Sequence, residues 1–222
     1  MKKILVISVN NFFLKKFKKK NYFFITKKKQ LNFNKIKKIN PNIIFFPHWS
    51  WKIPSLIINN FHCIGFHSTP LPYGRGGTPI QNMIIRGYKK TELCSFKLND
   101  TLDGGAIYLR NKFSLMGNYD QIANRMYKLI SFQMKKIIKH MPKEKVQKGK
   151  IVVFKRRKPK DSKLDFVENK KKIYNKVRML DSKEYKLPKA FYHIGNYTLT
   201  FSNADLNTKD FMNCNVKITS KK

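Results

Sequence analysis

The sequence predicts an α/β fold with a mostly parallel central sheet and a small β appendage near the C-terminus. Three observations lead to this prediction. Four short apolar segments of strand length occur in the first part of the chain, and the stretches between them have the length and the apolar faces of helices. Strands that alternate with helical connectors form parallel sheets covered by helices. Beyond a basic, proline-containing stretch, the pattern changes to short strands separated by turn residues.

The first part of the chain contains the strands expected to form the sheet. The first is β-branched and ends in a polar pair, and the third ends in a proline, both of which are typical of buried strands that lead into turns. The expected strands are Lys2–Val9, Tyr22–Thr26, Asn42–Pro47 and Cys63–Phe66, and the expected helical connectors are Phe12–Lys20, Phe33–Ile39 and Ile53–Asn60.

The middle of the chain adds two helices and a strand pair. Pro79–Arg86 is expected to be a helix that ends at Gly87, a residue that readily takes the left-handed cap conformation. Leu93–Leu98 and Ala106–Arg110 are predicted strands, separated by the turn-rich NDTLDGG. Tyr119–His140 has apolar residues at helical intervals, which predicts a long helix packed on the core.

The C-terminal part is expected to be a separate, smaller unit. Phe154–Lys163 is read as a basic linker, so the predicted domains are residues 1–153 and residues 154–222. After the linker we expect a helix over Glu168–Leu180 and three strands, the first two joined by the turn Gly195-Asn196; they are Tyr192–Ile194, Tyr197–Phe201 and Asn215–Ile218. A strand such as Tyr197–Phe201 could pair with a second subunit and make a homodimer.

Composition limits the functional classes. The 222 residues include 48 Lys and Arg against 12 Asp and Glu, a net charge of +36. Such a charge favours anionic ligands. The lysines are scattered through every expected element and accompany a richness in Asn, Ile and Phe, so we interpret them as solvated faces and do not expect nucleic acid as a partner. The three cysteines lack metal-site spacing, and no stretch approaches the roughly 20 apolar residues of a membrane span. We expect a soluble, cytoplasmic protein that needs no metal and no membrane.

The loop FHSTPLPYGRGG, residues 66–77, carries the first candidate for chemistry. His67 directly follows the expected strand Cys63–Phe66, at the end of a strand where open α/β sheets bind ligands. Asp103 lies in the loop between two further expected strands. A histidine paired with a carboxylate can accept a proton from an amine near neutral pH. The sequence therefore makes His67 and Asp103 a candidate pair.

The order of motifs around this pair resembles the folate-dependent formyltransferase family. The resemblance rests on FHSTPLPYGRGGTPIQNMIIRG followed by TLDGG, and it covers approximately residues 43–140. HWSW before the histidine and FKRRKP after it are similar to the members that formylate amino groups of nucleotide-activated sugars. The resemblance implies a Rossmann-like formyltransferase domain that moves the formyl group of N10-formyltetrahydrofolate to a nucleotide-linked amino sugar, without a metal.

The resemblance also assigns roles to residues. It makes His67 and Asp103 catalytic. The segments that would line the folate site are Trp49, Ser50 and Trp51, and Leu98, Asn99, Asp100 and Thr101. Position in the cleft and polarity suggest substrate contacts at Asn10, Tyr73, Arg75, Gly76 and Gly77. Simpler roles stay open for some of these: hydrophobic packing for the tryptophans, a structural salt bridge for Arg75 and positive φ for the glycines.

One position departs from the family pattern. The family has an asparagine two residues before the histidine, whose amide would help to hold the oxyanion of the tetrahedral intermediate. Here that position is Gly65. Backbone N–H groups, the Ser68 hydroxyl and the Asn82 amide are candidates to replace it, and the sequence does not choose between them.

Three other functions compete with the amino-sugar reading. Methionyl-tRNA formyltransferases share the catalytic core and fit the high charge, but they have a longer C-terminal domain, and only about 60 residues follow the linker here, fewer than in a typical domain. Glycinamide ribonucleotide formyltransferases have a Gly/Ser-rich phosphate loop after the first strand, where this chain has the bulkier Ser8–Phe13. A non-catalytic basic binding protein, degenerate at Gly65, is the third alternative.

Overall fold

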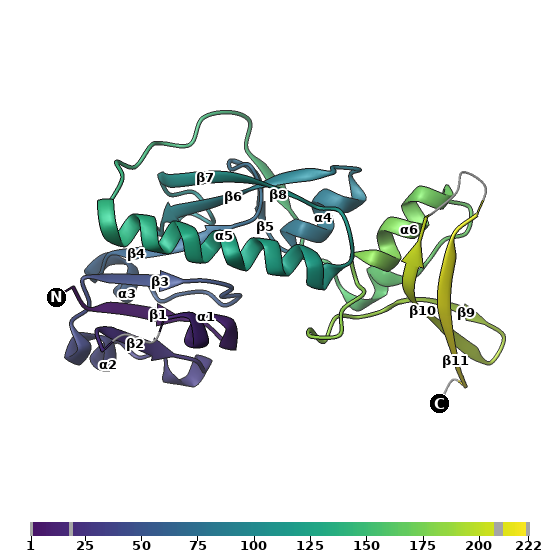
Figure 1. Cartoon of the computed structure of the whole chain (residues 1–222), viewed down its shortest axis with the longest axis horizontal. Helices are drawn as coiled ribbons and strands as arrows, with labels where there is room; N and C mark the ends of the chain where they lie inside the picture. Colours follow the sequence, from purple (N-terminus) through teal and green to yellow (C-terminus); the bar gives the residue numbers. More distant parts are fainter. Residues whose placement is uncertain (1, 18–19, 207–210, 221–222) are drawn as a thin grey trace. The chain divides into compact units, whose positions relative to one another are not determined.

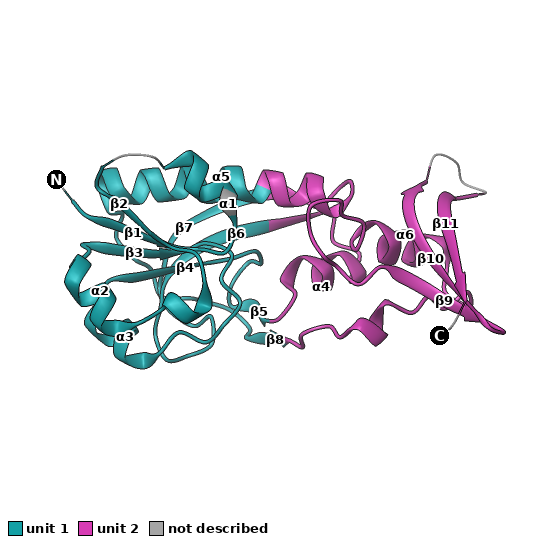
Figure 2. Cartoon of the chain, turned by 90° about the horizontal axis from the view of Figure 1, so that it is seen from below, with its two compact units in different colours: residues 1–76, 92–112, 126–153 teal, residues 77–91, 113–125, 154–222 magenta. Residues whose placement is uncertain are grey.

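The computed structural model describes residues 2–17, 20–206 and 211–220, which form two compact units (Figure 2). Unit 1 comprises residues 1–76, 92–112 and 126–153, and unit 2 comprises residues 77–91, 113–125 and 154–222. The expected domain boundary between residues 153 and 154 therefore matches only the last of the boundaries between the units, and it stays a prediction.

The elements follow the alternation expected from the sequence (Figure 1). In chain order they are β1 (Ile4–Ile7), α1 (Asn11–Lys16), β2 (Tyr22–Ile25), η1 (Lys28–Gln30), α2 (Phe33–Ile39), β3 (Ile43–Phe46), α3 (Ser55–Asn60), β4 (Cys63–His67), β5 (Tyr73–Gly76), α4 (Pro79–Ile85), β6 (Lys90–Lys97), β7 (Ile107–Ser114), α5 (Tyr119–His140), β8 (Val152–Phe154), η2 (Pro159–Ser162), α6 (Lys170–Arg178), β9 (Ala190–Ile194), β10 (Tyr197–Asp205) and β11 (Asn213–Ser220).

The central sheet confirms the predicted α/β fold class. Its strand order is β2-β1-β3-β4-β6-β7. Strands β2, β1, β3 and β4 run parallel to one another, whereas β6 runs antiparallel to β4. The strands β1 and β3 are buried along their whole length, which is why their sequences are apolar throughout instead of alternating.

Helices cover both faces of this sheet in unit 1, as Figure 2 shows. On one face, Ile36 of α2 and Ile57 of α3 join a core cluster with alternate residues of β1 and β3. On the other face, α5 packs against α1, where the rings of Tyr127 and Phe13 meet edge to face with centroids 5.5 Å apart. Successive strand residues point to opposite faces, so each strand feeds both layers.

Two strands were not expected. Strand β5 lies within the Pro/Gly loop and forms a two-stranded sheet with β8. The predicted linker Phe154–Lys163 begins in β8 and includes the short helix η2, so it is more ordered than a linker. The sequence of β5, YGRG, lacks the apolar pattern that marks a strand, and β8 is an apolar run of only three residues, VVF. Residues 18 and 19 of the expected connector Phe12–Lys20 lie outside the described residues.

The C-terminal appendage in unit 2 is an antiparallel sheet in the order β11-β10-β9. Tyr197 of β10 faces Ile194 of β9 on one side and Ser220 of β11 on the other. The expectation that the strand Tyr197–Phe201 pairs with a second subunit is therefore wrong, because both of its edges are occupied. A homodimer through the appendage stays a prediction that would need an outer strand.

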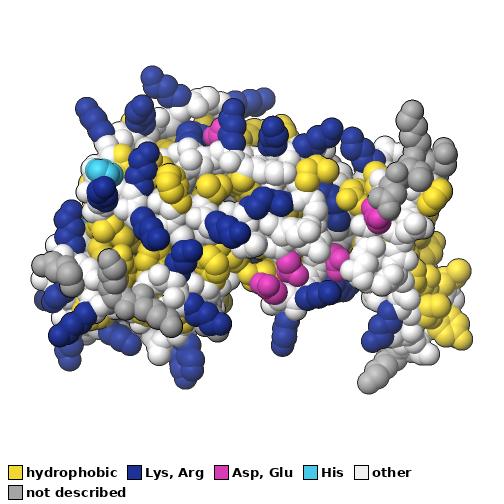
Figure 3. Space-filling model, in the orientation of Figure 1, with side chains coloured by type: hydrophobic (Ala, Val, Ile, Leu, Met, Phe, Trp, Pro, Cys, Tyr) yellow, Lys and Arg dark blue, Asp and Glu magenta, His cyan; other side chains and the backbone are white. Residues whose placement is uncertain are grey.

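On the face that Figure 3 shows, the positive charge has no single focus. Figure 3 shows Lys and Arg side chains spread over the visible face of both units. This distribution agrees with the interpretation of the lysines as solvated faces. Among the described residues, no helix has both the length and the apolar character that crossing a membrane requires.

Candidate active site

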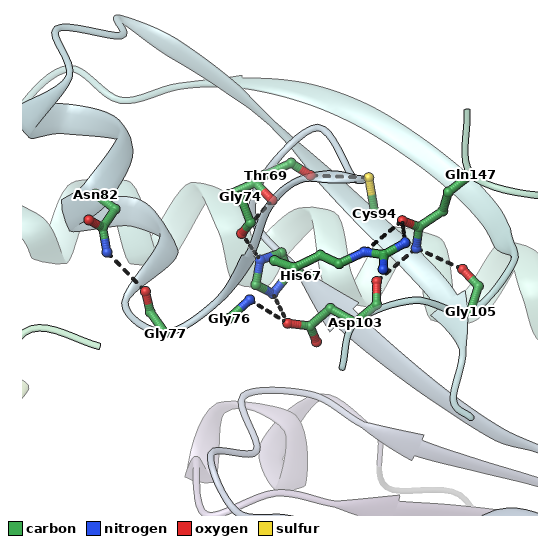
Figure 4. Close-up of polar contacts among 11 residues, drawn as sticks. His67, Thr69, Gly74, Gly76, Gly77, Asn82, Cys94, Asp103, Gly105 and Gln147 are labelled. Carbon is green, nitrogen blue, oxygen red and sulfur yellow. Dashed lines mark hydrogen bonds and ion pairs between the residues drawn. The ribbon is translucent and has the colours of Figure 1, made fainter. Parts of the chain in front are cut away.

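His67 is the last residue of β4, and its ring is held by the loop that follows it (Figure 4). The residue is 7% exposed. Its Nε2 lies 2.8 Å from the carbonyl oxygen of Gly74, which also accepts a hydrogen bond from the hydroxyl of Thr69 at 3.2 Å. A carbonyl oxygen only accepts hydrogen bonds, so we assign a proton to Nε2 of His67.

Asp103 faces the other ring nitrogen of His67. Its Oδ2 lies 3.5 Å from Nδ1 of His67 and accepts the backbone N–H of Gly76 at 2.8 Å. The structure thus brings together the two residues that the sequence singled out, although 36 positions separate them (103 − 67). A proton taken up at Nδ1 would be shared with the carboxylate, so the pair can accept and release a proton.

A network beside this pair was not expected from the sequence. Arg75 is 9% exposed, and its Nε and Nη2 donate to Oε1 of Gln147 at 3.2 and 2.8 Å. In the part of the chain that the structure describes, no ion pair joins Arg75 to a carboxylate, so the salt-bridge alternative for Arg75 is wrong. Gln147 lies in a lysine-rich segment without a recognisable motif, and no sequence signal identified it.

Gly65 leaves no room for a side chain in the present packing. A Cβ at this position would lie 2.9 Å from Cδ2 of Leu98 and 3.0 Å from Cζ of Phe96. The space in which the resemblance implies an asparagine is therefore closed by apolar side chains, which supply no oxyanion donor.

We expect Gly65→Asn to lower the free energy of unfolding by about 1–3 kcal/mol, because an inserted side chain forces packed neighbours aside. Leu98→Ala removes the nearer obstacle. The double variant should therefore lose less stability than the sum of the two single variants. Urea unfolding of the three variants measures this coupling. Strict additivity, or a Gly65→Asn variant as stable as the parent, would contradict the packing argument.

Asn82, a candidate to replace the missing asparagine, forms its side-chain hydrogen bonds with other groups of the chain. Its Nδ2 donates to the carbonyls of Gly77, Thr78 and Lys155 and contacts the Thr78 hydroxyl, at 3.0–3.2 Å. Its Oδ1 accepts from Arg86. These bonds hold the first turn of α4 to the segment that contains Lys155. The hydrogen-bonding capacity of the Asn82 amide therefore serves the structure of unit 2.

Comparison with known proteins decides the family. The Formyl transferase family model matches residues 8–141, and a model described as the methionyl-tRNA formyltransferase C-terminal domain matches residues 159–219. The chain belongs to the formyl transferase family. The predicted resemblance is thereby confirmed at the level of the family.

The relatives of this formyl transferase differ in the share of the chain that their matches cover. A methionyl-tRNA formyltransferase from a Sulfurihydrogenibium species is 30% identical over 161 residues, which cover 65% of this chain and 50% of the relative. The solved structure of a methionyl-tRNA formyltransferase from Clostridium thermocellum is 37% identical with a TM-score of 0.92, covering 99% of this chain and 100% of that one. The chain spans about half the length of the curated relatives it matches.

A sugar N-formyltransferase from a Shewanella species shares the fold of this formyl transferase. It is 16% identical with a TM-score of 0.69, and the match covers 94% of this chain and 100% of that one. At this level of identity the similarity shows the fold alone.

The two segments expected to line a folate site in this formyl transferase share one core cluster. Trp49 and Leu98 both pack against it. The rings of Trp49 and Trp51 meet edge to face with centroids 4.9 Å apart, and Trp51 is 39% exposed. Among the described residues the buried Nε1 of Trp49 has no hydrogen-bond partner. An aromatic wall with one unsatisfied donor suits a planar heteroaromatic ring that carries acceptors, which fits a pterin.

The remaining residues of these segments shape the loop before Asp103. Asn99 accepts the N–H of Thr101 at 3.1 Å, and the carbonyl of Thr101 accepts the N–H of Gly104 at 3.1 Å. Asp100 and Ser50 are exposed. The order in this loop therefore comes from local turns, and its exposed side chains are available to a ligand.

The expected substrate residues have different surroundings. Asn10 caps α1, since its Oδ1 accepts the N–H of Phe12 at 2.8 Å. Gly76 donates to Asp103, and Gly77 donates to the carbonyl of Phe154 at 3.0 Å. Tyr73 is half-buried in β5. Their contacts to a substrate stay a prediction. Three of the five residues also form hydrogen bonds that hold the backbone, namely Asn10, Gly76 and Gly77.

Burial shifts the pKa of two further titratable groups toward the neutral form. Burial lowers the pKa of His48, two residues after β3, below its usual value. Burial is also the main cause that raises the pKa of the Cys94 thiol to about 11, although Arg110 opposes it. The Cys94 thiol, which donates to the carbonyl of Thr69, therefore stays protonated at neutral pH and is a poor nucleophile.

Proposed function

We propose that this chain transfers a formyl group from N10-formyltetrahydrofolate to a primary amine, with the His67–Asp103 pair as its catalytic centre. The observation that carries the proposal is the buried His67 ring, which lies between the Gly74 carbonyl and the Asp103 carboxylate in the loop shared with the formyl transferase family. The unsatisfied N–H of Trp49 supports a folate derivative as the source of the formyl group.

In this reaction the protein must transfer one proton. When bound, the donor supplies an electrophilic formyl carbon. The new bond joins this carbon to the acceptor nitrogen, the bond to the folate nitrogen breaks, and one proton must pass from the former nitrogen to the latter. His67 and Asp103 hold that proton, and the carbonyl of Gly74 keeps the ring oriented by accepting from Nε2.

For the acceptor we propose the amino group of methionyl-tRNA. The two relatives described above at 30% and 37% identity carry this name, and the match over residues 159–219 carries it too. The lysines are scattered and mark no binding face, but a net charge of +36 still favours the encounter with an anionic acceptor. The sugar acceptor expected from the sequence is supported by the loop resemblance and by a fold shared at 16% identity. Methionyl-tRNA as acceptor replaces it, together with the expectation that nucleic acid is not a partner.

A competition between acceptors tests this proposal. Purified protein is mixed with N10-formyltetrahydrofolate and either methionyl-tRNA or a panel of nucleotide-linked amino sugars, and tetrahydrofolate release is followed. We expect turnover with methionyl-tRNA, with a KM that rises about ten-fold or more between 50 and 200 mM salt, because contacts to phosphates release counterions. Asp103→Asn serves as the inactive control.

Turnover with an amino sugar but not with methionyl-tRNA would contradict the proposed acceptor and would still support the proposed formyl transfer. Folate binding without turnover on any amine would reject the enzymatic proposal and leave a binding protein.

A further inference from the structure

Gln147 connects the two loops that form the candidate active site. Its Nε2 donates to the carbonyls of Asp103 and Gly105 at 2.7 and 2.9 Å, and its Oε1 accepts both bonds from Arg75 (Figure 4). A carboxamide has two N–H donors and two acceptor lone pairs. Every one of these is used, so this side chain is a fully satisfied bridge.

Asp103 is the residue that needs such support. Its φ is +47°, in the left-handed region that residues with a side chain seldom occupy. Such a conformation persists only where the surroundings over-determine it, and it is common at active sites. On the backbone side, Gln147 holds the Asp103 carbonyl. On the side-chain side, the N–H of Gly76 holds the carboxylate at 2.8 Å and so directs it toward His67.

Gln147 is itself placed by backbone pairing. Lys145, two residues before it, forms an antiparallel bridge with Ile107 at the start of β7, through bonds of 2.7 and 2.9 Å. The segment after α5 is thereby fixed to the strand that follows the Asp103 loop. The Gln147 side chain then reaches that loop on one side and the guanidinium of Arg75, next to Gly76, on the other.

We propose that Gln147 is a positioning residue, which keeps the Asp103 carboxylate aimed at Nδ1 of His67 by clamping the 103–105 backbone to Arg75. The inference rests on the proposed function for its catalytic consequence. This positioning role explains why the buried guanidinium of Arg75 has a neutral amide as its partner. A carboxylate in this place would satisfy Arg75 but would repel the two carbonyl oxygens that Gln147 now holds.

This asymmetry makes Gln147→Glu the decisive variant. It preserves the size and the acceptor for Arg75, and it removes both donors to the loop. We expect kcat to fall by about 10- to 100-fold, because displacement of a catalytic group by about 1 Å can cost that much, while KM for the folate donor changes less than two-fold. Gln147→Ala, which adds no repulsion, is expected to lower kcat in the same direction.

Gln30→Glu provides the matched control. Its Oε1 only accepts, from the backbone of Thr26 and Lys27, and a carboxylate can replace it there. This variant has the same change of charge, and its kcat should equal that of the parent. Circular dichroism and thermal unfolding establish that each variant is folded.

A second readout does not depend on turnover. Nitrogen-15 NMR of the imidazole rings reports the tautomer and hydrogen bonding of His67, which is assigned by the signal lost in His67→Asn. We expect the Nδ1 signal to move in Gln147→Glu and Gln147→Ala but not in Gln30→Glu. If the parent turns over no acceptor, the proposed function fails while this shift still supports the positioning role. Unchanged His67 signals in both folded Gln147 variants would overturn the inference, as would an unchanged kcat in both.

Discussion

Replacing His67 by alanine is expected to lower kcat for formyl transfer by about 10²–10⁴-fold, the usual contribution of a positioned acid-base group. The ring is the only imidazole in the described residues that lies within 3.5 Å of Asp103, and the Gly74 carbonyl fixes its orientation. Tetrahydrofolate release under saturating donor and acceptor gives the rate. A variant that is folded and retains kcat within ten-fold of the parent would remove His67 from the reaction.

Asp103→Asn tests the same pair from the other side with almost no change of shape. In the parent, the single oxygen Oδ2 of Asp103 both accepts the N–H of Gly76 and faces Nδ1 of His67. The amide oxygen of the variant can keep the bond from Gly76, but it carries no negative charge to stabilise a proton at Nδ1. We therefore expect a loss of kcat similar to that of His67→Ala, with an unchanged midpoint of unfolding. The double variant should lose little more, because the two residues act as a unit.

Much of the fold follows from periodicity and end signals in the sequence. The 22-residue helix α5 has the predicted bounds Tyr119–His140, and α2 has the predicted bounds Phe33–Ile39. Gly87 follows α4 with φ +83°, as a left-handed cap requires. These elements could be predicted because their apolar stripes repeat at helical intervals and their ends carry residues with a specific backbone preference.

The parts that could not be predicted depend on pairing between distant segments. Gln147 bonds to the carbonyl of Asp103 across 44 positions, and it has no local pattern that separates it from the neighbouring lysines. Strands β5 and β8 are likewise defined by each other. The central place of β10 depends on β11 continuing the sheet, which a turn signal between β9 and β10 does not reveal. The candidate pair His67 and Asp103 came from an ordered motif, but the contacts that orient it came only from the structure.

Gly105→Ala is expected to have the largest effect on stability, at about 4 kcal/mol or more, a loss seen when a substitution meets backbone that cannot move aside. A Cβ on Gly105 would lie 1.6 Å from the carbonyl oxygen of Lys97. That oxygen belongs to the last residue of β6, whose N–H donates to the carbonyl of Ala106 at 2.8 Å. The methyl group can be accommodated only if β6 and the start of β7 separate. Urea-induced unfolding, followed by circular dichroism, measures the loss.

Gly195→Ala is the matched control for an added methyl group. Gly195 has φ +48° in the β9–β10 turn, and a Cβ there meets no atom within 4 Å. Its cost should be limited to the left-handed conformation, about 1–2 kcal/mol. If the two variants lose equal stability, the close approach to Lys97 adds no cost at Gly105, and the packing argument is wrong. If Gly105→Ala loses much more, the close approach of Gly105 to Lys97 is what holds the Asp103 loop against the sheet. Folded Gly105→Ala protein should then also lose turnover, because Gln147 bonds to the same loop at the Gly105 carbonyl.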